Sequence, residues 1–383
     1  MSLFPLSPHT LRWASGQPFA LESGATLPGL ELAYRSWGTL NAAADNAVVV
    51  CHALTGTADA DDWWAPLFGA GRALDPARDL IVCSNVLGGC YGSTGPASVA
   101  PDGRRWGARF PRISVRDQVR AQMAFVDALG IRSIRLVIGG SMGGLQALEW
   151  ALLDPRRVRT VATIAASARH SPWCMAWSEA QRLALAADPK FRDGHYDHAD
   201  PPLAGLAAAR GIAMISYRSP DSLAQRFDRA TGAEVFGDAA RHPEDFAVHG
   251  WLRHHGAALT ARFDANSYRV LLDAMDTHDL ARGRGTLADA LAAIEQPVRV
   301  ISIASDLLYA PDEQRRLARL LPNAQYAELD SAHGHDGFLI DAVRIEPLIR
   351  DFRSRNSRHE APRQGEPREH LPQQADTCPV PAC

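Results

Sequence analysis

The stretch from Arg135 to Glu149 constrains the fold more than any other, because it requires a strand, a sharp turn and a helix in succession. A β-branched run meets the sequence GGSMG at residues 139–143 and continues into a helix-forming segment. This is the G-x-S-x-G motif in its strand–turn–helix context, and these flanks argue against an incidental serine in a glycine-rich turn. Glycines two residues before and after Ser141 let strand and helix approach without a Cβ clash. The motif predicts a nucleophilic hydroxyl at the end of a strand, with a helix N-terminus beneath any developing negative charge.

Composition indicates an ordinary globular protein. Of 383 residues, 46% are hydrophobic and 22% are charged, and 40 basic against 43 acidic residues give a net charge of -3. This balance argues against nucleic acid or an anionic membrane as the main partner. We expect no transmembrane helix and no secretion signal, since no apolar run is long enough and the N-terminus lacks a basic segment before an apolar one. Six cysteines without a framework or a Cys-x-x-Cys pair favour a reducing, cytoplasmic location.

The order of strand-like and helix-like segments predicts an interrupted α/β core. Residues 1–170 alternate strands with helices, and the alternation resumes at residues 294–354. Such alternation favours a mostly parallel sheet flanked by helices on both faces. Residues 171–293 contain almost no β-branched run and are predicted to form a helical insertion. Residues 355–383 are poor in apolar side chains, so we expect a disordered C-terminal tail.

Candidate partners for the serine follow two later strands. A serine hydroxyl is a weak nucleophile near neutral pH and needs a base, which in turn needs an orienting carboxylate. Asp306 directly follows a predicted strand at residues 298–304, and the next strand is followed by His333 and His335. The order Ser, Asp, His along the chain is that of α/β-hydrolase triads. The residues therefore predict a triad of Ser141, Asp306 and one of the two histidines.

Acyl chemistry also requires donors for the developing oxyanion. One donor is expected to be the backbone N–H of Met142, the residue after the nucleophile. The other is expected from the loop after an early central strand. Residues 48–56, with the sequence VVVCHALTG, have that form, so we assign the backbone N–H of Leu54.

Several clustered segments together resemble the homoserine O-acetyltransferase family, a group of acyltransferases with the α/β-hydrolase fold. The resemblance runs from about residue 15 to residue 350. It rests on the segments HALTG (52–56), GAGRALD (69–75), SNVLGGC (84–90), GSTGP (92–96), VRD (115–117), GGSMGG (139–144), QALEW (146–150) and GHD (334–336).

The resemblance implies a core domain at residues 1–170 and 294–354, a lid domain at residues 171–293 over an active-site tunnel, and a homodimer. The family's Gly-His-Asp segment makes His335 the base and Asp336 the partner of the acceptor's ammonium group. Arg210, in an Ala-Arg context of the lid, matches an arginine that contacts ligand. The implied reaction uses acyl-CoA as co-substrate and neither cofactor nor metal: acyl-CoA acylates Ser141, CoA leaves, and an amino-acid hydroxyl accepts the acyl group.

Two departures from the family pattern concern the choice of substrate. The loop after Gly56 is shorter than the family's usual loop, and Tyr91 stands where another residue is usual. Both features resemble the subgroup that succinylates L-serine. Our main prediction is therefore succinyl transfer from succinyl-CoA to L-serine, for cysteine biosynthesis. The alternative is acetylation or succinylation of L-homoserine, for methionine biosynthesis, and a more distant one is an esterase.

Side chains that select the substrates are expected near the lid and the oxyanion loop. A buried succinyl carboxylate needs a cation. The sequence offers Arg169, Arg182, Arg210 and Arg218 without choosing among them. Acyl or acceptor selectivity is further expected from His52, Ala53, Leu54, Thr55 and Ser178.

Overall fold

The computed structural model describes residues 4–360 of the chain and has an eight-stranded sheet at its centre. The strand order is β1-β4-β6-β5-β7-β8-β9-β10. The first two neighbouring pairs are antiparallel and all others are parallel. The predicted α/β fold is therefore confirmed. The strands are β1 (Leu11–Ser15), β4 (Leu30–Trp37), β5 (Ala47–Cys51), β6 (Leu80–Ser84), β7 (Ile134–Gly140), β8 (Val161–Ile164), β9 (Val298–Ile303) and β10 (Ala324–Leu329), beside a small hairpin of β2 (Phe19–Ala20) and β3 (Thr26–Leu27).

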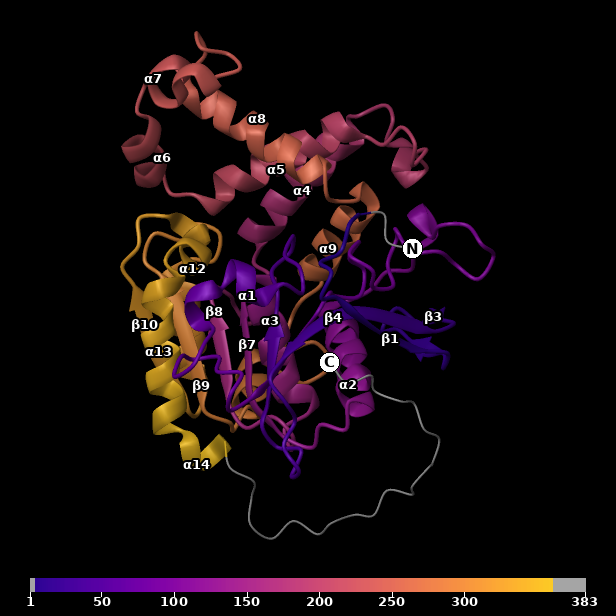
Figure 1. The fold of residues 1–383 in the computed structure, drawn as a ribbon, viewed down its shortest axis with the longest axis vertical. Helices are drawn as coiled ribbons and strands as arrows, with labels where there is room; N and C mark the ends of the chain where they lie inside the picture. The colour runs from indigo at the N-terminus through magenta and orange to yellow at the C-terminus, as the bar shows by residue number, and fades with distance from the viewer. Residues whose placement is uncertain (1–3, 361–383) are drawn as a thin grey trace.

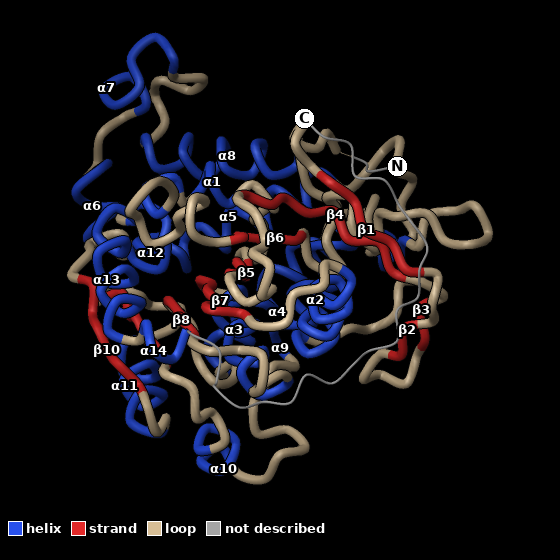
Figure 2. The backbone as a smooth tube through the Cα atoms, turned by 60° about the horizontal axis from the view of Figure 1, so that its bottom comes forward, coloured by secondary structure: helices blue, strands red, loops and turns tan. Residues whose placement is uncertain are grey.

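Helices cover both faces of this sheet, as Figure 2 shows with the strands in red between blue helices. Both faces need this cover because β5 is fully buried and its successive side chains point to opposite faces of the sheet, into two different cores. Val49 lies in a cluster with Leu148, whereas Val48 and Val50 lie in a cluster with Ile345. The helices of this core are α1 (Ala60–Trp63), α2 (Val115–Ala128), α3 (Met142–Leu153), α9 (Ala265–Asp276), α10 (Leu287–Ala292), α11 (Pro311–Leu320), α12 (Gly337–Ile340) and α13 (Ala342–Arg355).

Helix α3, which carries the serine motif at its start, is fixed to α2 by buried polar side chains. The side chain of Gln122 on α2 donates to Gln146 on α3 at 2.7 Å and accepts from the indole N–H of Trp150 at 2.8 Å. Hydrogen bonds of this kind orient a helix more specifically than apolar packing alone. The start of α3 is therefore held in one position relative to the sheet.

Five helices of the predicted insertion form a layer above the core in Figure 1. They are α4 (Pro172–Ala186), α5 (Leu203–Tyr217), α6 (Pro220–Phe227), α7 (Gly232–Phe236) and α8 (Ala247–Thr260). Helices α9 and α10 belong to the same stretch of sequence but pack on the sheet. Val270 and Leu291 lie in the hydrophobic cluster that also contains Val137 and Val300. None of the described helices is long and apolar enough to cross a membrane.

The chain end was predicted to be disordered from residue 355, yet its first residues are helical. Helix α13 ends at Arg355, and α14 covers Ser357–Glu360. Between them Asn356 is buried, and its side-chain amide donates to the carbonyl of Phe352 at 2.8 Å. This hydrogen bond caps the C-terminus of α13, and the helical structure continues beyond residue 355, where we predicted the tail to begin. The remainder of the predicted tail, residues 361–383, lies outside the described residues.

Candidate active site

The candidate residues meet at one edge of the sheet, where neighbouring parallel strands end. Residues 52–56 follow β5, residues 85–96 follow β6, and Ser141 follows β7. Asp306 and His335 follow β9 and β10. Parallel strands present their carboxyl ends on the same side, which is where open α/β sheets bind ligands. The topology therefore collects these segments although up to 283 residues separate them along the chain.

The serine motif forms a strained turn between β7 and α3. Ser141 has φ 55° and ψ −126°, and its N–H donates to the carbonyl of Ile164 at 2.9 Å. A Cβ added at Gly139 would lie 2.2 Å from the carbonyl oxygen of Gly143, and one at Gly143 would lie 2.0 Å from that of Cys51. Both positions therefore require glycine. A non-glycine residue at positive φ costs about 1–3 kcal/mol, and the surrounding packing holds it in place.

A continuous chain of hydrogen bonds joins Ser141, His335 and Asp306. The Nε2 atom of His335 lies 2.8 Å from the Oγ atom of Ser141, and its Nδ1 atom lies 2.8 Å from Oδ2 of Asp306. The second carboxylate oxygen of Asp306 accepts the backbone N–H groups of Leu308 at 2.8 Å and Tyr309 at 2.9 Å. The three side chains are nearly buried, with Ser141 8%, His335 2% and Asp306 1% exposed. With Nδ1 protonated toward the carboxylate, Nε2 can accept the serine proton.

The structure brings only one of the two candidate histidines to the serine. His333 points elsewhere, with its Nδ1 atom 3.3 Å from an Nη atom of Arg218. The imidazole of His335 is instead enclosed by aromatic rings, whose centroids lie 5.4–5.6 Å from its own. These rings exclude water from the histidine and belong to Tyr217, Tyr309 and Phe338.

A second buried histidine, which the sequence did not reveal, lies behind this site. The hydroxyl of Tyr309 is 3.0 Å from Nδ1 of His170, and Nε2 of His170 is 3.5 Å from a carboxylate oxygen of Asp276. Burial lowers the pKa of His170 to about 4, so this ring is neutral near pH 7. Ser178, which we expected to select the acyl group, lies close enough to Asp276 to lower the pKa of that carboxyl group, against the larger effect of burial, which raises it.

The loop after β5 lies against the first turn of α3. The close approach of Gly143 to the carbonyls of Cys51 and His52 establishes this contact. His52 connects neighbouring loops: its Nδ1 atom is 2.8 Å from the carbonyl of Ala53, and its Nε2 atom accepts the N–H of Val86 at 3.1 Å. Burial lowers the pKa of His52 to about 4, which keeps it neutral. Its ring thus holds the loop in place through both nitrogens.

An arginine from the segment between α8 and α9 anchors the same loop. Arg262 donates to the carbonyl of Thr55 at 2.9 Å and to the hydroxyl of Tyr91 at 2.5 Å. Leu54 and Met142, whose N–H groups we assigned as oxyanion donors, are both buried beside this connection. No local motif marks Arg262, because its partners lie 171 and 207 residues away.

Side chains of opposite charge lie together beside His335. Asp336 lies 4.0 Å from an Nη atom of Arg218, and burial raises the pKa of this carboxyl group. Arg210 stacks over the ring of Tyr217 at 5.5 Å and also faces Asp336. The arrangement places two guanidinium groups and a carboxylate together, a match for the opposite charges of an α-amino acid.

The other two candidate arginines already have carboxylate partners. Arg182 forms an ion pair with Asp276 at 2.6 Å, and Arg169 lies 3.6 Å from Asp279. Of the four arginines considered for a succinyl carboxylate, Arg210 and Arg218 therefore lie nearest to Asp336.

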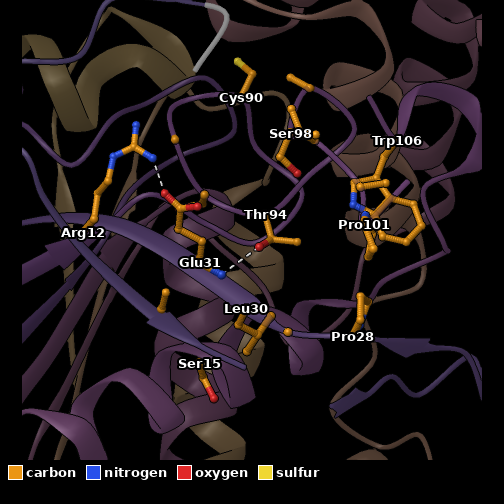
Figure 3. Close-up of a pocket in the computed structure, with 17 residues that line it drawn as sticks. Arg12, Ser15, Pro28, Leu30, Glu31, Cys90, Thr94, Ser98, Pro101 and Trp106 are labelled. Carbon is orange, nitrogen blue, oxygen red and sulfur yellow. Dashed lines mark hydrogen bonds and ion pairs between the residues drawn. The ribbon is translucent and has the colours of Figure 1, made fainter. Parts of the chain in front are cut away.

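A separate hollow of about 400 Å³ lies between strands β1 and β4 and the loop at residues 90–106 (Figure 3). Arg12 pairs with Glu31 there, and the N–H of Glu31 donates to the hydroxyl of Thr94 at 2.8 Å. Its lining includes none of the triad residues. Within residues 4–360, no group of three or more His, Cys, Asp and Glu side chains could hold a metal ion.

A serine, a histidine and an aspartate joined in this way at the edge of a mostly parallel sheet define the chain as an α/β-hydrolase-fold protein. The family model described as alpha/beta hydrolase fold matches residues 46–342. The chain is 52% identical over 350 residues to the homoserine O-acetyltransferase of Nostoc punctiforme, which covers 90% of this chain and 96% of that protein. The chain therefore belongs to the homoserine O-acetyltransferase family, and the resemblance stated from its sequence is confirmed.

Solved structures share the same backbone. The homoserine O-acetyltransferase of Bacillus anthracis superposes with a TM-score of 0.81 at 23% identity, over 90% of this chain and 96% of that one. The esterase E22 superposes with a TM-score of 0.80 at 25% identity, over 90% of this chain and 99% of that one. Proteins named as transferases and as esterases thus share this fold, so the reaction must be argued from the site.

Proposed function

We propose that this chain transfers an acetyl group from acetyl-CoA to the side-chain hydroxyl of L-homoserine, through an acyl-enzyme on Ser141. The observation that carries the proposal is 52% identity to a homoserine O-acetyltransferase across 90% of this chain. The hydrogen bonds from Ser141 through His335 to Asp306 supply the chemistry that such a transfer needs. The reaction uses acetyl-CoA as a co-substrate and no resident cofactor.

In the first half-reaction, Oγ of Ser141 attacks the thioester carbon while Nε2 of His335 takes the hydroxyl proton. The oxyanion accepts the backbone N–H groups of Met142 and Leu54, and the N-terminus of α3 adds its favourable dipole. The carbon–sulfur bond then breaks, and the CoA sulfur receives the proton from His335. Asp306 stabilises the imidazolium that exists between these two proton transfers.

In the second half-reaction, the homoserine hydroxyl takes the place of CoA. His335 removes its proton, the oxygen attacks the acyl carbon, and Oγ of Ser141 leaves with that proton. Asp336 pairs with the ammonium group of homoserine, and Arg210 pairs with its carboxylate. Arg218 lies beside Asp336 and adds a second positive charge near the homoserine carboxylate.

This proposal replaces our main sequence-based prediction, succinyl transfer to L-serine, for which these relatives give no support. That prediction depended on the short loop after Gly56. Two carboxylates of this loop, Asp59 and Asp61, form ion pairs with Arg35 on β4, at 2.9 and 2.6 Å. The loop is also closed by the indole N–H of Trp63, which donates to the carbonyl of Thr57 at 3.0 Å. A loop tied to β4 in this way gives no physical reason for a serine pocket.

A crossed assay tests the proposed function. Acetyl-CoA and succinyl-CoA are each combined with L-homoserine, with L-serine and with no acceptor, and CoA release and ester product are both measured. We expect the highest kcat/KM for acetyl-CoA with homoserine. A preference for serine or succinyl-CoA would contradict the proposal, and CoA release that is independent of acceptor would make the protein a hydrolase. The variant Ser141→Ala controls for background hydrolysis of the thioester.

The homodimer implied by the family resemblance remains a prediction. Large apolar side chains on α4 and α5 are exposed, and such surfaces commonly form interfaces. They include Trp173, Leu183, Leu203 and Ile215. Sedimentation equilibrium of the full chain measures this directly, and a single species with the mass of one chain would contradict it.

A further inference from the structure

A hollow of about 870 Å³ in the lid has no role in the reaction steps above. It opens between α8 and the chain from α6 through α7 to residue 246. Its side chains are of two kinds, aromatic and basic. The aromatic ones are Phe236, Phe246 and Trp251.

Every charged or titratable side chain that lines this hollow is basic. They are Arg226, Arg241, Arg253, His242, His254 and His255, and none of the described lining residues is Asp or Glu. Arg253 has an ion-pair partner in Asp245 at 2.6 Å. Arg226 contacts an aromatic ring, that of Phe227, at 5.1 Å, and within the described residues no carboxylate pairs with Arg226 or Arg241. The described lining of the hollow therefore carries an excess of positive charge.

One lining residue of the hollow, His255, lies near the arginines of the candidate active site. Helices α8 and α5 touch there, since a Cβ on Gly256 would lie 3.0 Å from Ala207. This contact brings His255 on α8 next to Arg210 on α5. Burial lowers the pKa of His255 to about 4, and the nearby charges of Arg210 and Arg218 act in the same direction. His255 thus links the lining of the hollow to the arginines that face Asp336.

We propose that this hollow binds the nucleotide end of the acyl donor, the phosphorylated adenosine diphosphate of acyl-CoA. The inference rests on the proposed function, because that function requires a CoA thioester. Guanidinium groups bind phosphates through charge-assisted hydrogen bonds. Aromatic side chains give an adenine ring a surface on which to stack, and Phe246 is 41% exposed. The thin pantetheine arm then runs inward past His255 to Ser141.

Replacing Arg226 and Arg241 by glutamine, singly and together, tests this site. The matched control is Arg104→Gln, an exposed arginine on the loop beside β1 and far from the lid in sequence. We expect the KM for acetyl-CoA to rise at least about tenfold in the double variant, since charge-assisted hydrogen bonds are lost. The kcat, the KM for homoserine and the behaviour of the control should remain those of the unmodified protein.

A truncated donor separates nucleotide binding from structural damage. S-acetyl-N-acetylcysteamine keeps the thioester but lacks the nucleotide, so its kcat/KM should be equal in the unmodified protein and the double variant. Equal losses for both donors, or no loss for acetyl-CoA, would overturn the proposal.

Direct binding gives a second measurement that needs no variant. Adenosine 3′,5′-bisphosphate should bind the unmodified protein in calorimetry and inhibit competitively against acetyl-CoA, but not against the truncated donor. Absence of binding would overturn the site even if transferase activity is found. Binding that Arg226→Gln and Arg241→Gln weaken, in a protein without transferase activity, would keep the site and reject the proposed function.

Discussion

Replacing Asp306 by asparagine tests whether this carboxylate sets the tautomer of His335. One oxygen of Asp306 accepts two backbone N–H groups, those of Leu308 and Tyr309, and the other faces Nδ1 of His335 at 2.8 Å. In the variant only the amide oxygen can accept the two N–H groups, so the amide nitrogen faces Nδ1. Nδ1 must then accept a hydrogen bond, and the ring proton moves to Nε2. A protonated Nε2 cannot take the proton of Ser141.

The size of this effect follows from the two available orientations of the amide. The orientation described above blocks the base, and such a tautomer block costs about 10⁴-fold in kcat in serine protease triads, or about 5.4 kcal/mol. The flipped orientation restores the tautomer but turns the amide nitrogen toward two backbone donors. Leaving both donors without acceptors costs about 1–3 kcal/mol each. The flipped route therefore costs about 2–6 kcal/mol in total, which is about 30-fold or more in rate, so we expect a loss between about 30-fold and 10⁴-fold.

The assay is the rate of CoA release from acetyl-CoA, both in the first turnover and at saturating homoserine. Both rates should fall together in Asp306→Asn, because His335 acts in both half-reactions. Asp312→Asn on the exposed side of α11 is the matched control and should have no effect. A loss smaller than tenfold, in a variant whose thermal unfolding midpoint is unchanged, would refute the assigned role of Asp306.

Three further predictions concern the acceptor, the serine turn and acid stability. Asp336→Asn should raise the KM for homoserine at least about tenfold but spare the burst of CoA release, since the ammonium partner is lost; an unchanged KM would contradict this. Gly143→Ala should unfold the protein in thermal melts, because its Cβ would lie 2.0 Å from the carbonyl oxygen of Cys51. Gly211→Ala, in open space on α5, should stabilise by up to about 1 kcal/mol. Burial lowers the pKa of the three core histidines His52, His170 and His278 to about 3–4, so the unfolded chain takes up their protons first as the pH falls. The free energy of unfolding, measured with urea, should therefore be highest above about pH 6.5. It should fall toward pH 4 by up to about 1.4 kcal/mol per pH unit for each of these histidines. A free energy that does not change with pH would contradict the neutral assignment of His52, His170 and His278.

The sequence by itself determined the backbone at the serine and the class of the fold. Gly139 is required by a contact inside the turn itself, with Gly143, whereas Gly143 is required by the distant carbonyl of Cys51. Both glycines are nevertheless readable directly from the motif. The central strands were predictable for a related reason, since a short continuous run of β-branched and apolar residues is a local pattern. Asp306 could be assigned because it directly follows one of these strands.

Only the tertiary structure decided which charged and polar side chains meet. The residues alone left His333 and His335 open and the family resemblance chose His335, which packing then placed on Ser141 across 194 residues. Packing also left Arg210 and Arg218 beside Asp336 and paired Arg182 with acids. The buried network of Tyr309 and His170, and the anchoring of the oxyanion loop by Arg262, carry no local signal at all. The physical reason is that hydrogen bonds and ion pairs act over a few ångströms in space, whatever the separation along the chain. Secondary structure follows from neighbours in sequence, whereas the chemistry of this site follows from neighbours that packing creates.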